Sequence, residues 1–229
     1  MKSIGVILAS GNGSRFGGDI PKQFVEINGR MVIEYTIDAF FRSKCIDEIV
    51  IVVNENYIHM MKTRIKSLER IKPIRVVIGG ISRKESCFNG ICSIQENDAK
   101  VLIHNAVQPF ITEKTLNDCS DALNFYNAVT VGSPSVYTVL AIDDNRILRS
   151  IVDRSHSVND LGPECFRLKF LRRVFTIAEN DDSFTNITGM VVKYKLGDVY
   201  VVNGDSTNIK ITYQNDVLVA KTIIESRKG

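Results

Sequence analysis

The chain has 229 residues, 44% of them hydrophobic and 24% charged, which is typical of a folded globular protein and excludes a mainly disordered or fibrous one. Lys and Arg number 29 against 26 Asp and Glu, and the resulting formal net charge of +3 is too small to indicate a nucleic-acid-binding protein. The apolar runs, such as residues 49–53, are far shorter than the roughly 20 residues of a membrane span.

The first residues predict a cytoplasmic protein. Met1-Lys2-Ser3 leads directly into a strand-like run at residues 4–9, without the apolar stretch and cleavage site of a signal peptide. The five cysteines include no Cys-x-x-Cys pair and the three histidines are isolated, so we expect reduced thiols and no zinc site. A hard ion with oxygen ligands, such as Mg²⁺, stays open at this point.

Strands and helices are predicted to alternate along most of the chain. Val- and Ile-rich runs indicate strands covered on both faces, and the segments between them have helical spacing; Ile33, Ile37, Phe40 and Phe41, for example, form one apolar helical face. This alternation predicts a Rossmann-like α/β fold, with a mostly parallel twisted sheet flanked by helices and ligands at the carboxyl ends of the strands. The predicted strands are 4–8, 49–53, 74–78, 101–103 and 128–131, and the predicted helices are 31–42, 55–70, 84–96 and 113–126.

The last part of the chain breaks this alternation. Residues 137–152 have the pattern of two strands around the turn-forming residues Asp143-Asp144-Asn145, which predicts a protruding β-hairpin arm at about 135–156. A final strand pair, 199–202 and 209–212, is expected to precede a helix from about 215 to 226. No linker or repeat interrupts the chain, so we expect a single domain over residues 1–229.

A glycine-rich loop follows the first predicted strand, and such a loop lets backbone N–H groups approach phosphate oxygens. It lacks a dinucleotide-binding fingerprint, because Phe16 takes the place of the third glycine and Pro21 interrupts the helix that should follow. It also lacks the P-loop pattern, because no Lys and Ser or Thr follow Gly18. Two cations remain, Arg15 and Lys22, and they indicate a site for a phosphorylated ligand.

Five sequence blocks carry a resemblance to a known family. They are the opening at residues 8–17 with Pro21-Lys22-Gln23-Phe24 and Asn28-Gly29, then Gly79-Gly80-x-x-Arg83-x-x-Ser86, residues 104–110, Val152-Asp153-Arg154, and Asn208-Ile209-Lys210-Ile211-Thr212 before a helix that contains Asp216. In this order and spacing they resemble the family that contains 2-C-methyl-D-erythritol 4-phosphate cytidylyltransferase and ribitol-5-phosphate cytidylyltransferase. The first and last blocks are the most specific.

The resemblance implies a nucleotidyltransferase type of fold and an enzyme that joins CTP to a sugar-alcohol phosphate, releasing pyrophosphate and forming a CDP-polyol. A phosphate monoester is already an anion near neutral pH, so this reaction needs alignment and charge neutralisation more than a strong base. The catalytic residues that the resemblance implies are Arg15, Lys22, Lys210 and Arg154.

The resemblance also implies the binding residues. For the nucleotide they are Ala9, Ser10, Gly11, Gly13, Gly80, Arg83, Ser86, Asn105 and Ala106, and for the acceptor Thr138, Arg154, Thr185 and Lys210. Arg154 belongs to the arm and is expected to reach the site of a second subunit, so we expect a homodimer formed through the arm, which has little core of its own. Asn105 and Asp205 are the candidate ligands for Mg²⁺.

The departures from the family pattern gather on the acceptor and metal side. Asn105 and Gln108 stand where the family has Asp and Arg, and Tyr137 replaces the usual Asp before the arm Thr. Gly162-Pro163-Glu164 stands where Thr-Pro-Gln is usual, and Thr185-Asn186 replaces a Thr-Asp pair. Because Mg²⁺ prefers carboxylate to amide oxygen, these changes predict a weakened metal site.

We therefore rank a ribitol-5-phosphate-like acceptor first. The CDP-polyol product is then expected to serve the synthesis of a cell-envelope polysaccharide. Methylerythritol phosphate, the acceptor of isoprenoid biosynthesis, is the first alternative. A pseudoenzyme that binds CTP without releasing pyrophosphate is the second, motivated by Asn105 and Gln108. A dehydrogenase is a third, suggested by the strand followed by Gly-x-Gly, although the misplaced third glycine opposes it.

Overall fold

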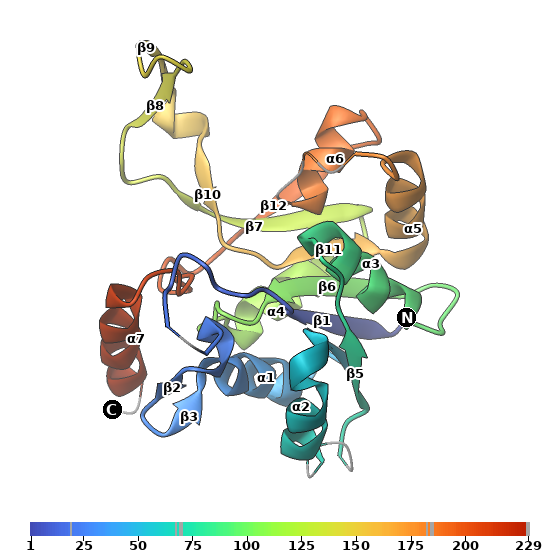
Figure 1. The fold of residues 1–229 in the computed structure, drawn as a ribbon. Coiled ribbons are helices and arrows are strands. Elements are labelled where there is room, and N and C mark those ends of the chain that lie inside the picture. Colours follow the sequence, from blue (N-terminus) through green and yellow to red (C-terminus); the bar gives the residue numbers. More distant parts are fainter. Residues whose placement is uncertain (19, 67, 69–70, 182, 184–185, 228–229) are drawn as a thin grey trace.

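A central sheet organises the chain, whose computed structural model describes residues 1–18, 20–66, 68, 71–181, 183 and 186–227 (Figure 1). Seven strands lie in the order β10-β7-β11-β6-β1-β4-β5, and an eighth, β12, pairs with β7. The strands are β1 (Ser3–Ala9), β4 (Glu48–Val53), β5 (Ile74–Ile78), β6 (Lys100–Asn105), β7 (Ala128–Pro134), β10 (Val158–Asp160), β11 (Glu164–Arg167) and β12 (Val199–Asn203).

Most pairings in this sheet are parallel, so the predicted α/β fold is confirmed. β1 pairs in parallel with β4 and β6, β4 with β5, and β7 with β12, whereas β10 and β11 run antiparallel to their neighbours. The register places Leu8 of β1 beside Asn105 of β6 and beside Val52 of β4. The carboxyl ends of these strands therefore meet at one edge, where the site is expected.

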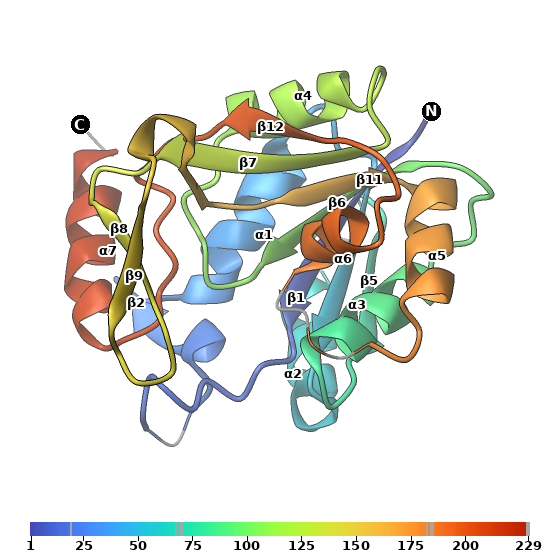
Figure 2. The ribbon, with the colours of Figure 1, turned by 90° about the horizontal axis from the view of Figure 1, so that it is seen from above.

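Helices cover both faces of the sheet. Helices α1 (Val32–Arg42), α2 (Ile58–Ile65) and α4 (Glu113–Ala122) pack on one face, and α3 (Arg83–Cys92), α5 (Leu168–Ile177) and α6 (Ile187–Lys193) pack on the other (Figures 1 and 2). The last helix, α7 (Asn215–Ser226), packs on a third apolar cluster with Val107, Phe110 and Ile211. None of the helices in the described part of the chain is long and apolar enough to cross a membrane.

The uninterrupted apolar runs are explained by this two-sided cover. In β4, Ile49, Ile51 and Val53 belong to the cluster under α1 and α2, while Val50 and Val52 belong to the cluster under α3 and α5. All five side chains are fully buried. Burial of such a side chain contributes roughly 1.5–3 kcal/mol, so the strands that carry the site stand on a rigid base.

The predicted arm is present as a hairpin of β8 (Val139–Ile142) and β9 (Leu148–Val152). Its turn is closed by Asp143, whose Oδ1 accepts hydrogen bonds from the backbone N–H groups of Asn145 and Ile147. Figure 1 shows the hairpin projecting away from the central sheet. Every residue of β9 is exposed, so the arm adds nothing to the core of its own chain.

One predicted strand, residues 209–212, is wrong. The structure has no strand there; instead the Ile211 N–H donates to the Val107 carbonyl, and Ile211 is fully buried against the α7 cluster. The alternation that suggested a strand comes from Ile209 and Ile211 packing on α7 and not on a sheet.

Other predicted boundaries need correction, and some elements were not predicted. The helix expected over 55–70 is a 3-10 turn, η2 (Glu55–Tyr57), followed by α2, with residues 67 and 69–70 outside the described part. The helices expected to end at 96 and 126 end at Cys92 and Ala122. The elements without a prediction are the 3-10 turns η1 (Lys22–Phe24) and η3 (Arg154–His156), the small hairpin β2 (Glu26–Ile27) and β3 (Arg30–Met31), the strands β10 and β11, and the helices α5 and α6.

Candidate active site

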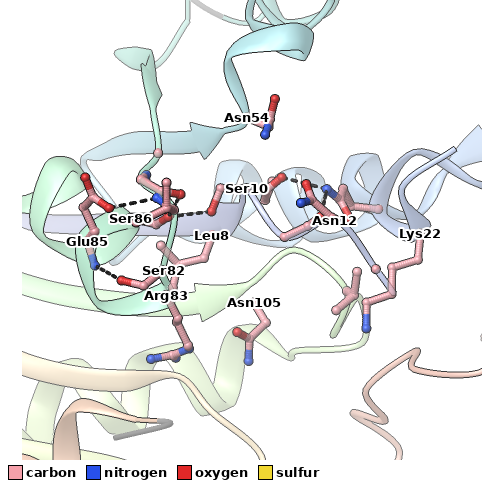
Figure 3. A pocket seen from close by; sticks show the side chains of 18 of the residues that line it. Leu8, Ser10, Asn12, Lys22, Asn54, Ser82, Arg83, Glu85, Ser86 and Asn105 are labelled. Atoms are coloured by element: carbon pink, nitrogen blue, oxygen red, sulfur yellow. Dashed lines mark hydrogen bonds between the residues drawn. The ribbon is translucent and has the colours of Figure 1, made fainter. Parts of the chain in front are cut away.

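A pocket of about 750 Å³ opens at the carboxyl ends of β1, β5 and β6 (Figure 3). Eleven of the residues singled out from the sequence line it, and they come from segments far apart in the chain. They are Ala9, Ser10, Gly11, Gly13, Arg15, Lys22, Gly80, Arg83, Ser86, Asn105 and Lys210. The sequence analysis thus located the pocket, while the roles it gave these residues stay predictions.

The glycine-rich loop is held in shape by a side chain that the sequence analysis did not single out. Gln23, which is buried, donates from Nε2 to the carbonyl oxygens of Ala9 and Gly11, both at 2.8 Å. Gly13 has a φ of +70°, and a Cβ there would lie 3.3 Å from the Lys22 backbone nitrogen. The signal for Gln23 was its place in the Pro-Lys-Gln-Phe block beside Lys22.

Small residues form the wall on the other side of the loop. Ser10 Oγ donates to Ser86 Oγ at 2.8 Å, and Ser86 Oγ also accepts from the Gly80 backbone N–H at 3.0 Å (Figure 3). A Cβ on Gly79 would come within 2.6 Å of Ser10 Cβ, so only glycine permits this approach. The wall is therefore made of small polar residues and backbone that lie close together at the pocket.

Four cations, Arg15, Lys22, Arg83 and Lys210, share the pocket. Burial, together with Lys210 and Arg15, lowers the pKa of Lys22 to about 8, although Asp216 opposes the shift. Burial, together with Arg83 and Arg15, likewise lowers the pKa of Lys210 below its ordinary value. These cations are close enough to repel one another, which is the arrangement expected around a ligand with several negative charges.

Arg83 differs from the other three because it is paired with a carboxylate. Its Nη2 donates to Glu164 Oε2 at 2.8 Å, and Glu164 is buried. Burial works against the charged form of Arg83, but Glu164 and its neighbours outweigh that cost and raise the pKa. Arg83 still lines the pocket, and in Figure 3 it points to the same side as Asn105 and Lys22.

Two amides replace the charged pair that the family pattern has at the end of β6. Asn105 Nδ2 donates to Gln108 Oε1 at 2.5 Å, and Gln108 Nε2 donates to the Leu161 carbonyl at 2.7 Å. These bonds fix the orientation of both amides, and Asn105 lines the pocket. The site is thus neutral where the family pattern has one charge of each sign.

The neighbouring His104 is not placed to act as a base. Its Nε2–H donates to the Gln108 carbonyl at 2.8 Å, and burial lowers its pKa to about 4. Its Nδ1 is buried without a hydrogen-bond partner among the described residues. His104 therefore stays neutral near pH 7 and packs against Phe40 beneath the site.

The described residues do not form a cage for a resident Mg²⁺. Among them, no group of three or more His, Cys, Asp or Glu side chains is placed to hold a metal ion. Asp205 does not line the pocket: its Oδ1 accepts from the Thr207 N–H at 2.8 Å and its Oδ2 lies 3.7 Å from Arg227 Nη2. Asn105 Oδ1 alone is a weak ligand for a hard divalent ion.

Several predicted site residues lie apart from this pocket. Ala106 needs correction: it is fully buried, its N–H donates to the Leu8 carbonyl and its carbonyl accepts from Thr36 Oγ1, so it has no free group for a nucleotide. Thr138 and Arg154 belong to the exposed arm and do not line the pocket of their own chain. Thr185 lies outside the described residues.

Comparison with known proteins finds relatives over nearly the whole chain. The family model described as 2-C-methyl-D-erythritol 4-phosphate cytidylyltransferase matches residues 4–226. The chain is 34% identical to the protein of that name from Bifidobacterium longum subsp. infantis, over 99% of this chain and 81% of the relative. It is 32% identical to the ribitol-5-phosphate cytidylyltransferase of Vibrio parahaemolyticus, over 99% of this chain and 98% of the relative.

A solved structure from Anaerococcus prevotii, described as 4-diphosphocytidyl-2C-methyl-D-erythritol synthase, has the same fold. It superposes with a TM-score of 0.88 at 27% identity, over 98% of this chain and 96% of that one. The chain therefore belongs to the 2-C-methyl-D-erythritol 4-phosphate cytidylyltransferase family, whose members are nucleotidyltransferases that use CTP.

Proposed function

We propose that this cytidylyltransferase transfers CMP from CTP to a sugar-alcohol phosphate of the ribitol-5-phosphate type. The products are a CDP-polyol and pyrophosphate. The observation that carries the proposal is the cluster of Arg15, Lys22, Arg83 and Lys210 around one pocket whose opposite wall is made of serine and glycine. The cationic part suits the phosphate groups of CTP and of the acceptor, and the other part suits a base and ribose.

The chemistry requires charge neutralisation rather than a base. The acceptor phosphate oxygen attacks the α-phosphorus of CTP, the bond to the β-phosphate oxygen breaks, and pyrophosphate leaves. Arg15 and Lys22 stabilise the negative charge that grows on the transferred phosphoryl group and on the leaving pyrophosphate. His104, with its pKa lowered to about 4, takes no part in proton transfer.

The choice of acceptor is supported by the amide pair. Asn105, held by the buried Gln108, gives the pocket a neutral amide at the end of β6, which suits a hydroxyl group of a polyol. The relative from Vibrio parahaemolyticus, named for ribitol-5-phosphate, supports the same acceptor class. A product of this kind fits the supply of a cell-envelope polysaccharide.

Methylerythritol phosphate is the second candidate acceptor. The family model and the relative from Bifidobacterium longum subsp. infantis carry the name of that substrate and favour it. Isoprenoid biosynthesis is then the pathway served. Both candidates are sugar-alcohol phosphates, so the same pocket geometry serves either one.

The proposed active form is a homodimer in which each arm completes the other subunit's site. The arm exposes a row of apolar side chains that a folded monomer leaves uncovered. These are Val139, Leu140, Ile142, Leu148, Ile151 and Val152, each at least 39% exposed. Thr138 and Arg154, at the base of the arm, are the residues that contact the acceptor in this proposal.

Mg²⁺ enters the proposal as part of the MgCTP substrate. Mg²⁺ keeps several waters and binds nucleotide phosphates readily, so it needs few protein ligands. Of the two ligands predicted from the sequence, Asn105 lines the pocket and Asp205 does not. The use of CTP also supports the cytoplasmic location that the sequence analysis expects.

The test is pyrophosphate release from CTP and Mg²⁺ with a panel of acceptors: ribitol-5-phosphate, methylerythritol phosphate, other pentitol and hexitol phosphates, and glycerol-3-phosphate. ATP, GTP and UTP serve as nucleotide controls. We expect release with CTP and ribitol-5-phosphate at the highest kcat/KM. A higher kcat/KM with methylerythritol phosphate reverses the ranking of the acceptors. CTP binding without pyrophosphate release in the presence of any acceptor of the panel identifies a pseudoenzyme.

A further inference from the structure

Glu164 is a buried carboxylate on which three elements of the fold converge. It is 2% exposed and stands at the start of β11. Its Oε2 accepts from Arg83 Nη2 at 2.8 Å, and its Oε1 accepts from the backbone N–H groups of Ile187 at 2.6 Å and Thr188 at 2.8 Å. A buried carboxylate is costly unless it is paired and hydrogen-bonded, and here both oxygens are satisfied.

Arg83 connects this network to the pocket. It is the first residue of α3, it lines the pocket, and its side chain is 31% exposed. A guanidinium has five N–H groups, so the bonds to Glu164 Oε2 and Cys87 Sγ hold the head group and leave further donors for a ligand. In Figure 3 the Arg83 head group lies on the same side as Asn105.

We propose that Glu164 is a positioning residue of this pocket: it holds Arg83 at the pocket wall and supplies the negative charge that lets Arg83 and Lys210 share the pocket as a binding site for the acceptor phosphate. The inference rests on the proposed transferase function, because that function gives the pocket a phosphorylated acceptor. It assigns a role to the Glu that stands where the family pattern has Gln.

The charges around Lys210 explain why a carboxylate is needed. Lys210 faces cations on three elements, Arg83 on α3, Arg15 on the glycine-rich loop and Lys22 on η1. The groups on the other side are the carboxylates of Asp160 on β10 and Glu164 on β11, and the neutral His104 on β6.

Loss of either partner in the ion pair therefore acts on Lys210 in a definite direction. Arg83 lowers the pKa of Lys210, and Glu164 raises it. Without the Glu164 charge, the pKa falls further and Lys210 loses its proton at a lower pH. Without the Arg83 charge, it rises.

The experiment compares Glu164→Gln, Arg83→Gln and the double variant with the unchanged protein. Glu164→Gln alters charge with little change in size. The pKa of Lys210 is measured by NMR on ¹³C-methylated lysines, with the Lys210 signal assigned by its loss in Lys210→Arg. We expect a shift of the order of one pH unit downward in Glu164→Gln, a shift upward in Arg83→Gln, and a value between them in the double variant.

Kinetics provide the second readout. In Glu164→Gln we expect KM for the acceptor to rise several-fold, with a smaller change in KM for CTP. The matched control is Glu48→Gln, which also removes a buried carboxylate bonded to an arginine, Arg75, but at the amino end of β4, away from the pocket. It lowers thermal stability without changing the Lys210 titration or the acceptor KM.

Two outcomes overturn the inference. One is a Glu164→Gln variant that loses stability as Glu48→Gln does while its Lys210 titration and acceptor KM stay unchanged. The other is an Arg83→Gln variant with an unchanged Lys210 titration, which decides the matter even if Glu164→Gln does not fold. The titration needs no turnover, so the absence of pyrophosphate release in the unchanged protein counts against the proposed function alone.

Discussion

The two sides of the pocket are built in different ways. The side proposed to bind the nucleotide, made of residues 10–15, Lys22 and Gly79-Gly80, is fixed by backbone groups, by close glycine contacts and by Gln23. The side proposed to bind the acceptor consists of side chains, namely the neutral Asn105, the paired Arg83 and the cationic Lys210, and the arm that is proposed to complete it does not line the pocket of its own chain. A backbone-built site tolerates few changes, whereas a side-chain-built site can change specificity within the same fold.

Lys22→Ala tests the nucleotide side and has the largest expected effect. Loss of a charged contact to the transition state lowers kcat by roughly 10²-fold or more. Lys221→Ala, on the exposed surface of α7, is the matched control and keeps normal turnover. Near-normal turnover of Lys22→Ala in a steady-state pyrophosphate assay removes this residue from the mechanism.

Arg154→Ala tests whether the acceptor side is shared between subunits. Loss of a charge-assisted contact to phosphate lowers kcat/KM for the acceptor by roughly tenfold or more, with CTP binding unchanged. Mixing this variant with Lys22→Ala then restores activity, because one site of each mixed dimer has both residues. We expect roughly a quarter of normal activity after subunit exchange. No recovery, with mixed dimers present by native mass spectrometry, contradicts a shared site.

The pH dependence of CTP binding sharpens the contrast. The pKa of Lys22 is lowered to about 8. Bound triphosphate favours the protonated form, so CTP affinity is full below about pH 8 and falls as the pH rises through that value. Calorimetry between pH 6.5 and 9 measures it. In Lys22→Arg the residue stays charged over this pH range, so the fall in CTP affinity that Lys22 causes disappears. If the pH profile of CTP affinity is the same in Lys22→Arg as in the unchanged protein, another group causes the fall.

The lowered pKa of Lys22 predicts that the stability of the protein without ligand changes with pH in the opposite direction to CTP affinity. The ordinary pKa of lysine, 10.5, returns on unfolding, so between about pH 8 and 10.5 the unfolded chain binds more protons than the folded one at Lys22. The contribution of Lys22 to the free energy of unfolding therefore rises with pH in this window. Urea denaturation of the unchanged protein and of Lys22→Met across this pH window isolates the contribution of Lys22. If the free energies of unfolding of the two proteins change in parallel with pH, the prediction is wrong.

Asn105→Asp tests the amide pair and has the smallest expected effect. A carboxylate at this position binds Mg²⁺ better than an amide, so the Mg²⁺ concentration for half-maximal rate falls a few-fold. In this variant a carboxylate oxygen replaces the Asn105 N–H donor and lies against the acceptor oxygen of Gln108. The double variant Asn105→Asp with Gln108→Arg removes this conflict, because the arginine donates to the new carboxylate. If neither variant changes the Mg²⁺ dependence, the ion does not meet residue 105.

The sequence predicted those parts of the fold that are encoded by local patterns. The apolar runs of β1, β4 and β6 and the turn of the arm lie in continuous segments, so period and turn chemistry were sufficient. Strand β11 is short and antiparallel among parallel neighbours, and its pairing with β6 depends on contacts distant in the chain. The strand predicted at residues 209–212 is wrong for a similar reason. Ile211 stands between polar residues, as in a strand, but it packs on α7, which a local pattern does not reveal.

The site was predicted to the same extent. The loop cations and Lys210 were located because their motifs lie in continuous segments, and the fold brings them together. The ion pair of Arg83 with Glu164 joins residues 81 positions apart in the sequence, so no local sequence pattern predicts it. The burial of Ala106 likewise depends on strand pairing, since the atoms that engage its backbone belong to Leu8 and Thr36.

The pairing of β1 with β6 also limits how the pocket can move. Leu8 and Asn105 lie side by side in the register, and the Ala106 N–H donates to the Leu8 carbonyl just where both strands end. The starting points of the glycine-rich loop and of the Asn105 turn are thereby fixed relative to each other. Any widening that admits CTP or releases the product must therefore come from the pocket-lining segments outside the sheet, such as the loop around Arg15, residues 54–56 and 79–82, and the irregular segment that carries Lys210.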